Sequence, residues 1–212
     1  AKTWLVSALA ADWGVEQLRD NAATVTLGRR TMGFTRLADG TYAAPAGLTS
    51  TLVRDPVTDF FRIDERYDRT THFDAQDRLS HLTDADGQTL ALAYHATGPD
   101  LGRLHTVTDA YGRTLTLAYT GGRLTTVADS TGRTVGYAYT DGLLTEITDA
   151  EGHTSAFTYD SADRIWQIFN ERAEKVAENT YDPHGQIRLQ IAEDDPAQTW
   201  HYAFTGALNT ET

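Results

Sequence analysis

The sequence nearly copies itself every twenty residues between Arg103 and Tyr159. Each copy opens with a stretch of leucine, threonine and β-branched residues, passes an aspartate and a glycine, and ends in an aromatic residue. The three copies are Arg103–Tyr119, Arg123–Tyr139 and Leu143–Tyr159. A fixed period of this size indicates stacked supersecondary units, in which each unit packs against its neighbours. The chain is therefore predicted to be built around a repeat array.

Each copy is predicted to contain two strands and two turns. In Val135–Tyr139, large apolar residues alternate with small ones, which is the period of a half-buried strand. Between the strands, Asp stands first and Gly fourth, as a type I turn prefers, and Gly accepts the positive φ of a following bulge. A three-residue hairpin loop fits this spacing better than a primed two-residue turn. The predicted structural turn residues are Asp84, Gly87, Asp109, Gly112, Asp129, Gly132, Asp149, Gly152, Asp182 and Gly185.

The length of the loop determines which side chains share a face of the sheet. A three-residue loop places Val107 opposite Leu115. Tyr119 follows Leu115 in the same alternation and is expected on that apolar face, whereas Leu104 is expected on the other one. A single open layer of hairpins leaves its apolar face uncovered, so we expect the sheet to curl, to gain a second layer or to self-associate.

A tyrosine recurs at the strand end of successive units. The members of this aromatic row are Tyr94, Tyr119, Tyr139, Tyr159, Tyr181 and Tyr202. If neighbouring units pair, we expect these rings to stack across strands as a packed structural row. The alternative is a solvent-facing row on which sugars could stack.

Composition excludes several classes of partner and site. The chain has 212 residues, 40% of them hydrophobic, which suffices for a core or an array of units. A net charge of -12 should repel phosphate backbones, so no nucleic-acid partner is expected. The absence of cysteine excludes disulfides and thiolate metal sites. No stretch approaches eighteen consecutive apolar residues, so no membrane span is predicted. No signal peptide is present in this chain, and any export signal is expected to lie upstream or to have been removed.

The chain can be divided into three regions according to how clearly the repeat is present. We predict a β-rich lead-in region at residues 1–72, a repeat array at 73–206 and a tail at 207–212. Ala8–Arg19 fits either a short amphipathic helix or a lead-in strand. His95–Gly102 is predicted to be an enlarged loop. Asn170–Glu178 lacks the expected glycine, so either the turn differs there or a short helix intrudes.

A second pattern, Tyr-Asp-x-x-Gly-Arg-Leu, precedes several of the predicted strands. It is fullest at Phe73–Leu79, Tyr159–Ile165 and Tyr181–Ile187. This unit resembles the YD repeat of RHS proteins, including bacterial RHS shells and teneurin-like cell-surface proteins. The resemblance implies an all-β fold of antiparallel hairpin repeats that forms a curved sheet strip or a partial shell. In that family such shells enclose a C-terminal toxin or serve adhesion.

The chain also departs from the toxin-bearing members of that family. These members end their shell with a self-cleaving segment that holds an Asp-Pro-x-Gly-Leu motif. Asp182–Gly185 matches the first four positions, but Gln186 follows it, so this stretch is predicted to be an ordinary repeat turn. The chain is also far too short to close a complete shell of the kind this family builds.

No constellation of residues predicts catalysis, a cofactor or a metal. The seven histidines show no zinc-binding spacing. Asp84–Gly87 begins like a calcium loop, but His95 occupies the twelfth position, where an acid is required. We therefore predict no catalytic, cofactor-binding or metal-binding residues.

The leading interpretation is a non-catalytic structural module of an exported RHS-like protein, in a shell or an adhesion scaffold. We expect it to self-associate or to belong to a larger RHS protein, outside the cell or at its surface. The alternative is a module that binds carbohydrate or the cell surface, and a third hypothesis is a small hydrolase.

Overall fold

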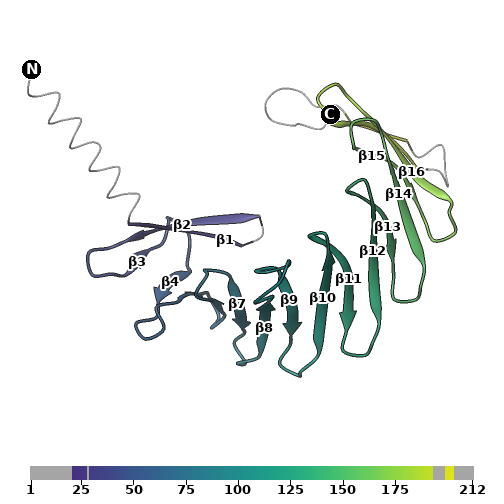
Figure 1. Ribbon diagram of the computed structural model, residues 1–212. Coiled ribbons are helices and arrows are strands. Elements are labelled where there is room, and N and C mark those ends of the chain that lie inside the picture. Colours follow the sequence, from purple (N-terminus) through teal and green to yellow (C-terminus); the bar gives the residue numbers. More distant parts are fainter. Residues whose placement is uncertain (1–20, 28, 193–198, 203–212) are drawn as a thin grey trace, which may run out of the picture. The chain divides into compact units, whose positions relative to one another are not determined.

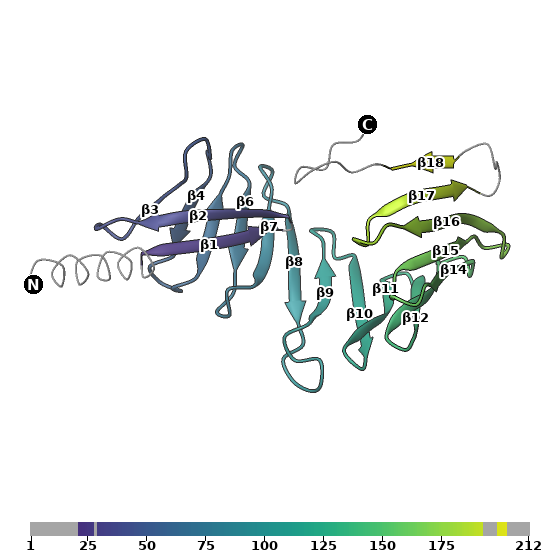
Figure 2. The same cartoon turned by 90° about the horizontal axis from the view of Figure 1, so that it is seen from above.

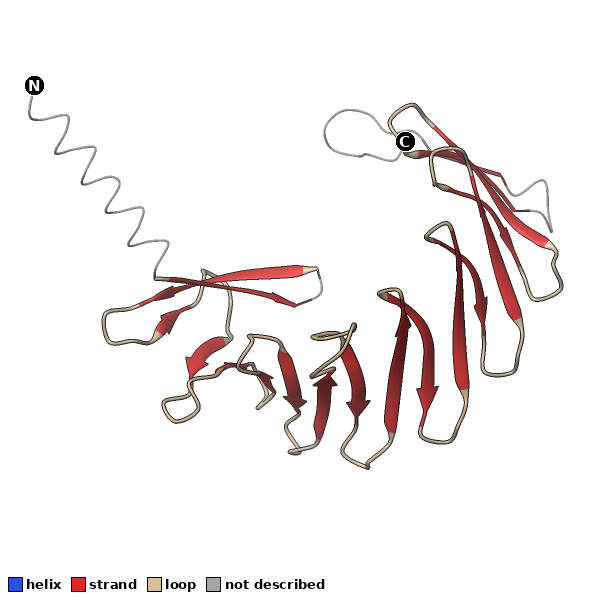
Figure 3. Cartoon of the chain, viewed as in Figure 1, coloured by secondary structure: helices blue, strands red, loops and turns tan. Residues whose placement is uncertain are grey.

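The computed structural model describes residues 21–27, 29–192 and 199–202, and these residues form strands and turns without a helix (Figure 3). The predicted all-β fold of antiparallel hairpins is therefore confirmed. Ala8–Arg19 lies outside the described residues. The helix considered for Asn170–Glu178 is wrong, because a turn at residues 170–174 leads directly into a strand there.

The strands form two antiparallel sheets (Figures 1 and 2). The first sheet contains β1 (Ala22–Leu27), β2 (Arg30–Arg36) and β3 (Tyr42–Ala43). The second contains β4 (Thr51–Arg54), β5 (Phe61–Asp64), β6 (Thr70–Phe73), β7 (Leu79–Thr83), β8 (Thr89–Tyr94), β9 (Leu104–Thr108), β10 (Thr114–Thr120), β11 (Arg123–Asp129), β12 (Thr134–Thr140), β13 (Leu143–Thr148), β14 (Thr154–Tyr159), β15 (Ile165–Phe169), β16 (Lys175–Tyr181), β17 (Ile187–Ala192) and β18 (Thr199–His201). Strands β4 to β18 follow one another in sequence order, each hydrogen-bonded to the next.

Internal contacts divide the chain into two compact units. Unit 1 comprises Ala1–Tyr94 and Val107–Arg113, and unit 2 comprises His95–Thr106 and Thr114–Thr212. The domains predicted from the sequence follow the repeat pattern instead, and they stay predictions.

Unit 1 has two layers around a small hydrophobic core. Strands β1 to β3 lie over β4 to β6, as Figure 2 shows from above. Met32 and Phe34 are two residues apart on β2, so both point to the same face, where they meet Leu52, Ile63 and Phe73. These five side chains are the buried hydrophobic residues among those the structure describes.

Unit 2 is a succession of hairpins whose sheet curves from β10 to β16 (Figure 1). Val127 pairs with Val135 across the β11–β12 turn, and Ile147 pairs with Ser155 across the β13–β14 turn. The Asp129 amide donates to the carbonyl oxygen of Arg133 at 2.9 Å and closes the loop. The predicted three-residue loop and its register are confirmed in these repeats.

A β-bulge at the other end of the hairpins changes the face of one leucine. The pairing of β10 with β11 shifts between Ala118 and Tyr119, and Leu124 consequently stands opposite Tyr119. Leu144 stands opposite Tyr139 in the same way. Simple alternation predicted the equivalent residue, Leu104, on the face away from tyrosine. Leu124 and Leu144 lie on the tyrosine face instead, because the extra residue of a bulge resets the alternation. For Leu104 itself the expectation stays a prediction.

The apolar face of unit 2 stays partly open to solvent. No hydrophobic side chain of its described part is buried, and Leu115 is 45% exposed. No helix of the described residues is long and apolar enough to cross a membrane.

Candidate functional site

The repeated Asp-x-x-Gly turns are the first candidate site. In the β11–β12 turn, Asp129 Oδ1 accepts the backbone N–H groups of Thr131 at 2.9 Å and Arg133 at 3.0 Å. Asp129 Oδ2 accepts Arg133 Nε–H at 2.8 Å. Gly132 adopts a φ of 90°, which suits glycine better than a residue with a Cβ. One carboxylate thus satisfies two backbone donors and holds the cation that follows the turn.

The other predicted turn residues occupy the same positions. Oδ1 of Asp84, Asp109, Asp149 and Asp182 accepts the backbone amides two and four residues ahead. Gly87, Gly112, Gly152 and Gly185 all have positive φ. Asp74 and Asp160, which lie in the Tyr-Asp type of turn, make the same bonds and also bind an arginine.

In two of these turns the bonds lower the pKa of the aspartate. The Thr131 hydroxyl and then the Arg133 side chain hold the pKa of Asp129 well below its usual range. The side chain of Arg164 does the same for the pKa of Asp160. A hydrogen bond from a donor to a carboxylate stabilises its charged form. Asp129 and Asp160 therefore act as fixed acceptors and not as proton donors near neutral pH.

The turn without a glycine keeps this geometry. Asn170 Oδ1 accepts the amides of Arg172 and Glu174, both at 3.0 Å. Ala173 takes the position of the glycine at a φ of 59°. Asn can replace Asp because its side-chain carbonyl is the same acceptor. This turn therefore differs from the other turns in its residue types, but its backbone has the same conformation.

Two turns at the tyrosine end of the hairpins are of another kind, which the sequence analysis missed. Gly121 and Gly122 have φ values of 57° and 78°, and Asp141 and Gly142 have 51° and 89°. Two successive positive φ values between paired strands define a primed two-residue turn, which suits the twist of a hairpin. The Gly-Gly and Asp-Gly dipeptides at these positions are typical of primed turns and could have predicted them from the sequence.

Five tyrosines of the aromatic row bind the main chain of the preceding strand. Each hydroxyl donates to a backbone carbonyl at 2.6 to 2.9 Å. The pairs are Tyr94 with Leu79, Tyr119 with Leu104, Tyr139 with Leu124, Tyr159 with Leu144, and Tyr181 with Ile165. Tyr202 follows β18, and its backbone amide donates to the Arg188 carbonyl.

An arginine covers four of these rings. The guanidinium carbon lies 4.2 Å from the ring centroid in Arg78–Tyr94, 5.5 Å in Arg103–Tyr119, 5.9 Å in Arg123–Tyr139 and 4.4 Å in Arg164–Tyr181. These distances are within the range of cation–π attraction. The guanidinium of Arg123 also explains why residue 142 is a glycine, because a Cβ added there would come within 2.7 Å of Arg123 Nη2.

The expected stacking of one tyrosine on the next does not occur. Among the described residues, no ring contact joins two members of the row. Four of the rings meet an arginine and a backbone carbonyl instead, and Tyr159 meets a carbonyl. The physical reason is spacing: the tyrosines stand on every second strand, so consecutive rings are about 9.5 Å apart. The sequence analysis did not predict the arginine contacts, because they form between residues sixteen or seventeen positions apart.

Two pairs of histidines also meet across the sheet. The rings of His72 and His81 are stacked, with centroids 4.0 Å apart and an interplanar angle of 10°. His95 lies 4.3 Å from His105, and the Nε2 atom of His95 is buried without a partner among the described residues. Burial and the neighbouring His81 lower the pKa of His72. The histidines were predicted to have no ligand role, and that remains a prediction.

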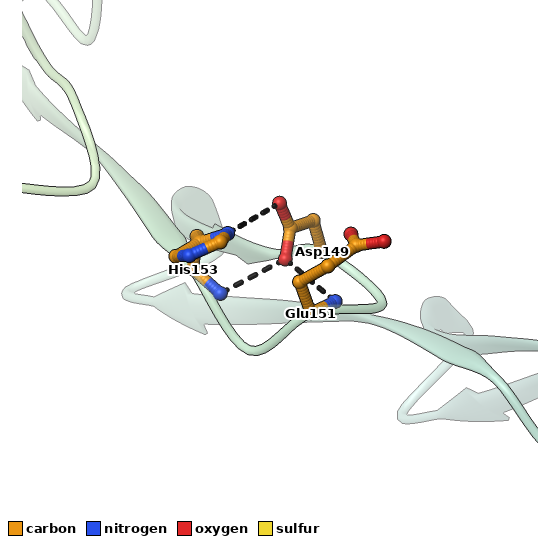
Figure 4. Close-up of side chains that lie close together, drawn as sticks. All are labelled: Asp149, Glu151 and His153. Carbon is orange, nitrogen blue, oxygen red and sulfur yellow. Dashed lines mark hydrogen bonds and ion pairs between the residues drawn. The ribbon is translucent and has the colours of Figure 1, made fainter.

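One turn brings together three side chains that could touch a metal ion (Figure 4). One ligand atom each from Asp149, Glu151 and His153 lies within 4.8 Å of the others. The imidazole Nδ1 of His153 is 3.3 Å from Asp149 Oδ2, and Figure 4 shows the Glu151 carboxylate directed away from the imidazole. Exposed groups of this kind are common without an ion, and Asp149 Oδ1 already accepts two amides. We assign no metal here. Asp84, at the calcium-like stretch, makes the same turn as its counterparts.

Comparison with known proteins connects this repeat geometry to a family. The family "Teneurin YD-shell" matches residues 50–203. A search of curated proteins found no match. Among solved structures, a chain of "Crystal Structure of TcdB2-TccC3-Cdc42" is similar over 76% of this chain, with 19% sequence identity and a TM-score of 0.45. The match spans 8% of that chain. The family match covers well over half of the sequence, and the chain belongs to the teneurin YD-shell family of RHS/YD-repeat proteins.

Proposed function

We propose that this chain is a structural segment of the wall of a larger exported YD-repeat shell. The observation that carries the proposal is the recurrence of the same turn, tyrosine and arginine contacts in successive hairpins of the array. A catalytic site concentrates unlike groups at one place, whereas a wall repeats the same contacts along its length. The role is therefore mechanical support and not chemistry.

The two ends of the strand order support a place within a larger protein. Strands β4 and β18 end the strand order, and each has one hydrogen-bonded neighbour among the described strands. An edge strand offers unpaired backbone groups to which another strand can pair. Further repeats of the same protein would extend the wall at these edges and remove the exposed backbone.

The proposal is tested by removing one complete repeat. Deletion of residues 124–143 joins Arg123 to Leu144 and preserves the Arg-Leu sequence that begins each unit. Stability in repeat proteins is roughly a sum over units and their interfaces. The shortened protein should keep its β-type circular dichroism and a cooperative melt.

A second deletion serves as the control. Deletion of residues 130–140 removes β12 with its turn, so the following strands would be reversed and would carry their apolar face on the other side of the sheet. This variant should aggregate or lose its cooperative melt. A complete-repeat deletion that unfolds as readily as the control would contradict the wall proposal.

The edge strands give the proposal a second test, in the form of self-association. We expect light scattering after size-exclusion chromatography to give a mass above 23.3 kDa at micromolar concentration. Trp200→Lys places a charge on edge strand β18 and should return the mass toward that of one chain, because edge charges oppose strand pairing. A single chain at every concentration would show that the edges do not pair with a second copy.

A further inference from the structure

Strand β1 is the outer strand of the first sheet, and one of its edges has no strand beside it among the described residues (Figure 2). At its beginning, the amide of Arg36 donates to the carbonyl oxygen of Asn21. Hydrogen-bonded and non-bonded pairs alternate along an antiparallel ladder, so every second residue from there on bonds β2. The backbone groups of Ala22, Thr24 and Thr26 therefore point toward the free edge.

A hollow of about 400 Å³ follows this edge between the two layers of unit 1. The consecutive residues 21–26 all border it. Successive side chains of a strand point to opposite faces, so a consecutive run means that the hollow lies along the edge of the strand and not against one face. Its volume is within the range of about 300–1,000 Å³ that is typical of ligand sites.

The floor of this hollow is apolar. Leu52, Phe61 and Phe73 line it from the second sheet. Ala23 and Val25 of β1 point toward the same side, because both pack against the core of unit 1. Residues that stand opposite each other in a ladder direct their side chains to the same face. A further strand beside β1 would therefore place every second side chain on this floor.

The end of the hollow at the beginning of β1 is cationic. Its lining includes the guanidinium groups of Arg36 and Arg54 and the carboxylate of Asp77. Arg54 Nη2 lies 2.6 Å from Asp59 Oδ2, whereas Arg36 has no ion pair or side-chain hydrogen bond with the described residues. A carboxylate that reaches this end would find an unpaired guanidinium, which binds carboxylates through charge-assisted hydrogen bonds.

The free backbone edge, the apolar floor and the free cation together match an extended peptide. A row of backbone donors and acceptors is complemented by another strand, whereas a lipid has no such row to offer. The floor favours apolar side chains at alternate positions. Antiparallel pairing is the more stable kind, and it would place the C-terminus of the peptide at the beginning of β1, beside Arg36.

A second copy of this chain fits the edge less well than a separate peptide does. Strand β18 contains three residues, which is too few to cover β1. The apolar side chains of β1 and β4 already pack in the core of their own unit, so neither strand has them free to fill the hollow of another copy.

We propose that β1 and this hollow bind the extended C-terminal segment of another protein by β-strand addition. The segment lies antiparallel to β1, with alternate apolar side chains on the floor and its terminal carboxylate at Arg36. The site does not depend on the wall proposal, because its residues lie within unit 1 alone.

The first test uses the peptide Val-Thr-Leu-Lys-Val-Thr-Ala with a free C-terminus, which is long enough to face residues 21–27. Calorimetry with the full chain should show saturable binding with a Kd of about 10 μM to 1 mM, as a short strand contact allows. The peptide Val-Leu-Val-Thr-Lys-Thr-Ala has the same composition without the alternation and should bind about tenfold more weakly. Equal affinities, or no saturable binding of the first peptide, would overturn the proposal.

Methylation of the peptide backbone distinguishes strand addition from simple hydrophobic binding. The N–H of the fourth peptide residue would donate to the Thr24 carbonyl, whereas that of the third residue would point away from β1. N-methylation at the fourth residue should weaken binding about tenfold or more, and N-methylation at the third should change it little. Similar losses from both would overturn the proposal, and the comparison uses the native chain.

Two substitutions at one position locate the site. Thr24→Pro removes the N–H that points to the free edge and no bond to β2, and proline is tolerated at such positions of edge strands. This variant should weaken binding about tenfold or more. Thr24→Val keeps the N–H and should bind like the native chain. A Thr24→Pro chain that keeps both its melting temperature and its affinity would contradict the proposal.

Arg36→Gln tests the cationic end. It should weaken binding of the free-acid peptide severalfold and leave the affinity for the C-terminal amide of the same peptide nearly unchanged. Equal effects on the two forms would show that the carboxylate does not reach Arg36 and would contradict the proposed orientation.

Hydrogen exchange of the Thr24 amide reports whether the edge is already occupied. This amide should exchange fast in the full chain alone and slowly when the first peptide is saturating, because a new backbone bond protects it. Slow exchange in the chain alone would show that another part of this chain or a second copy covers the edge, and would overturn the proposal.

Discussion

The buried hydrophobic side chains all lie in unit 1, between Met32 and Phe73, whereas the described part of unit 2 contains none. Unit 1 covers the face of its strands with a second layer, β1 to β3. Unit 2 has no such layer among its described residues and depends on bonds that recur at each hairpin. The same kind of strand is thus stabilised in one unit by burial and in the other by local polar contacts.

This difference matters for how each unit responds to change. Burial concentrates the free energy of unfolding on a few side chains, because a packed core cannot refill a cavity. Repeated contacts spread it over many residues, each worth about 1 kcal/mol. Unit 1 should therefore have a few sensitive positions, and unit 2 should tolerate most single substitutions.

The largest expected effect is in the core of unit 1. Ile63 is fully buried, and Ile63→Ala should lower the free energy of unfolding by about 2–5 kcal/mol. Val127→Ala in unit 2 removes a half-buried side chain and should cost about 1 kcal/mol. Urea denaturation followed by circular dichroism measures both. Equal losses would mean that the two units are stabilised in the same way.

A backbone substitution in unit 2 should have the next largest effect. No atom lies within 4 Å of a Cβ added at Gly132, so the cost of Gly132→Val comes from its φ of 90° and not from a clash. A left-handed conformation costs an L-residue about 1–2 kcal/mol, and a β-branched residue more. Ser130→Val in the same turn keeps an ordinary φ and should be nearly neutral. In a denaturant melt, Gly132→Val should therefore have a lower midpoint than Ser130→Val. Equal midpoints would contradict the backbone strain expected at residue 132.

The turns could be predicted from the sequence because their chemistry is local. Asp129, Thr131 and Arg133 lie within five residues, and the type of each residue determines which backbone groups it can bond. The register that follows from these turns was predicted correctly as far as Val135. The bulge that places Leu124 opposite Tyr119 was not predicted, because a bulge depends on how two strands meet and not on their separate patterns.

The core of unit 1 is harder to predict for the same reason. Phe34 and Ile63 belong to different sheets, and no repeat relates their segments. The secondary structure of each segment can be predicted from its own sequence. The contact between the segments is tertiary, and local propensity does not determine it. The Arg123–Tyr139 contact was missed likewise, although both residues recur in the pattern.

A single hydroxyl tests the polar contacts of unit 2. Tyr139→Phe removes the donor to the Leu124 carbonyl and should cost about 0.5–1.5 kcal/mol. Tyr137 lies two residues earlier on the same strand, and its hydroxyl has no partner among the described residues. Tyr137→Phe should therefore leave the free energy of unfolding nearly unchanged. If both variants melt alike, the recurring hydroxyl bond contributes nothing to the stability of the array.

The smallest expected effect is a dependence of unit 1 on pH. Burial, His81 and Arg62 lower the pKa of His72, while Asp64 opposes them. A lowered pKa means that the fold favours neutral imidazole, so this stability is present above about pH 6.5 and is lost as the pH falls below that value.

The melting temperature should consequently be about 1–3 °C lower at pH 5.0 than at pH 7.5 through this group alone. His72→Gln should reduce the difference between the two pH values, whereas His184→Gln, in an exposed turn, should not. His72 would then be a place where unit 1 responds to mild acid. A pH dependence that His72→Gln leaves untouched would place the response in another histidine.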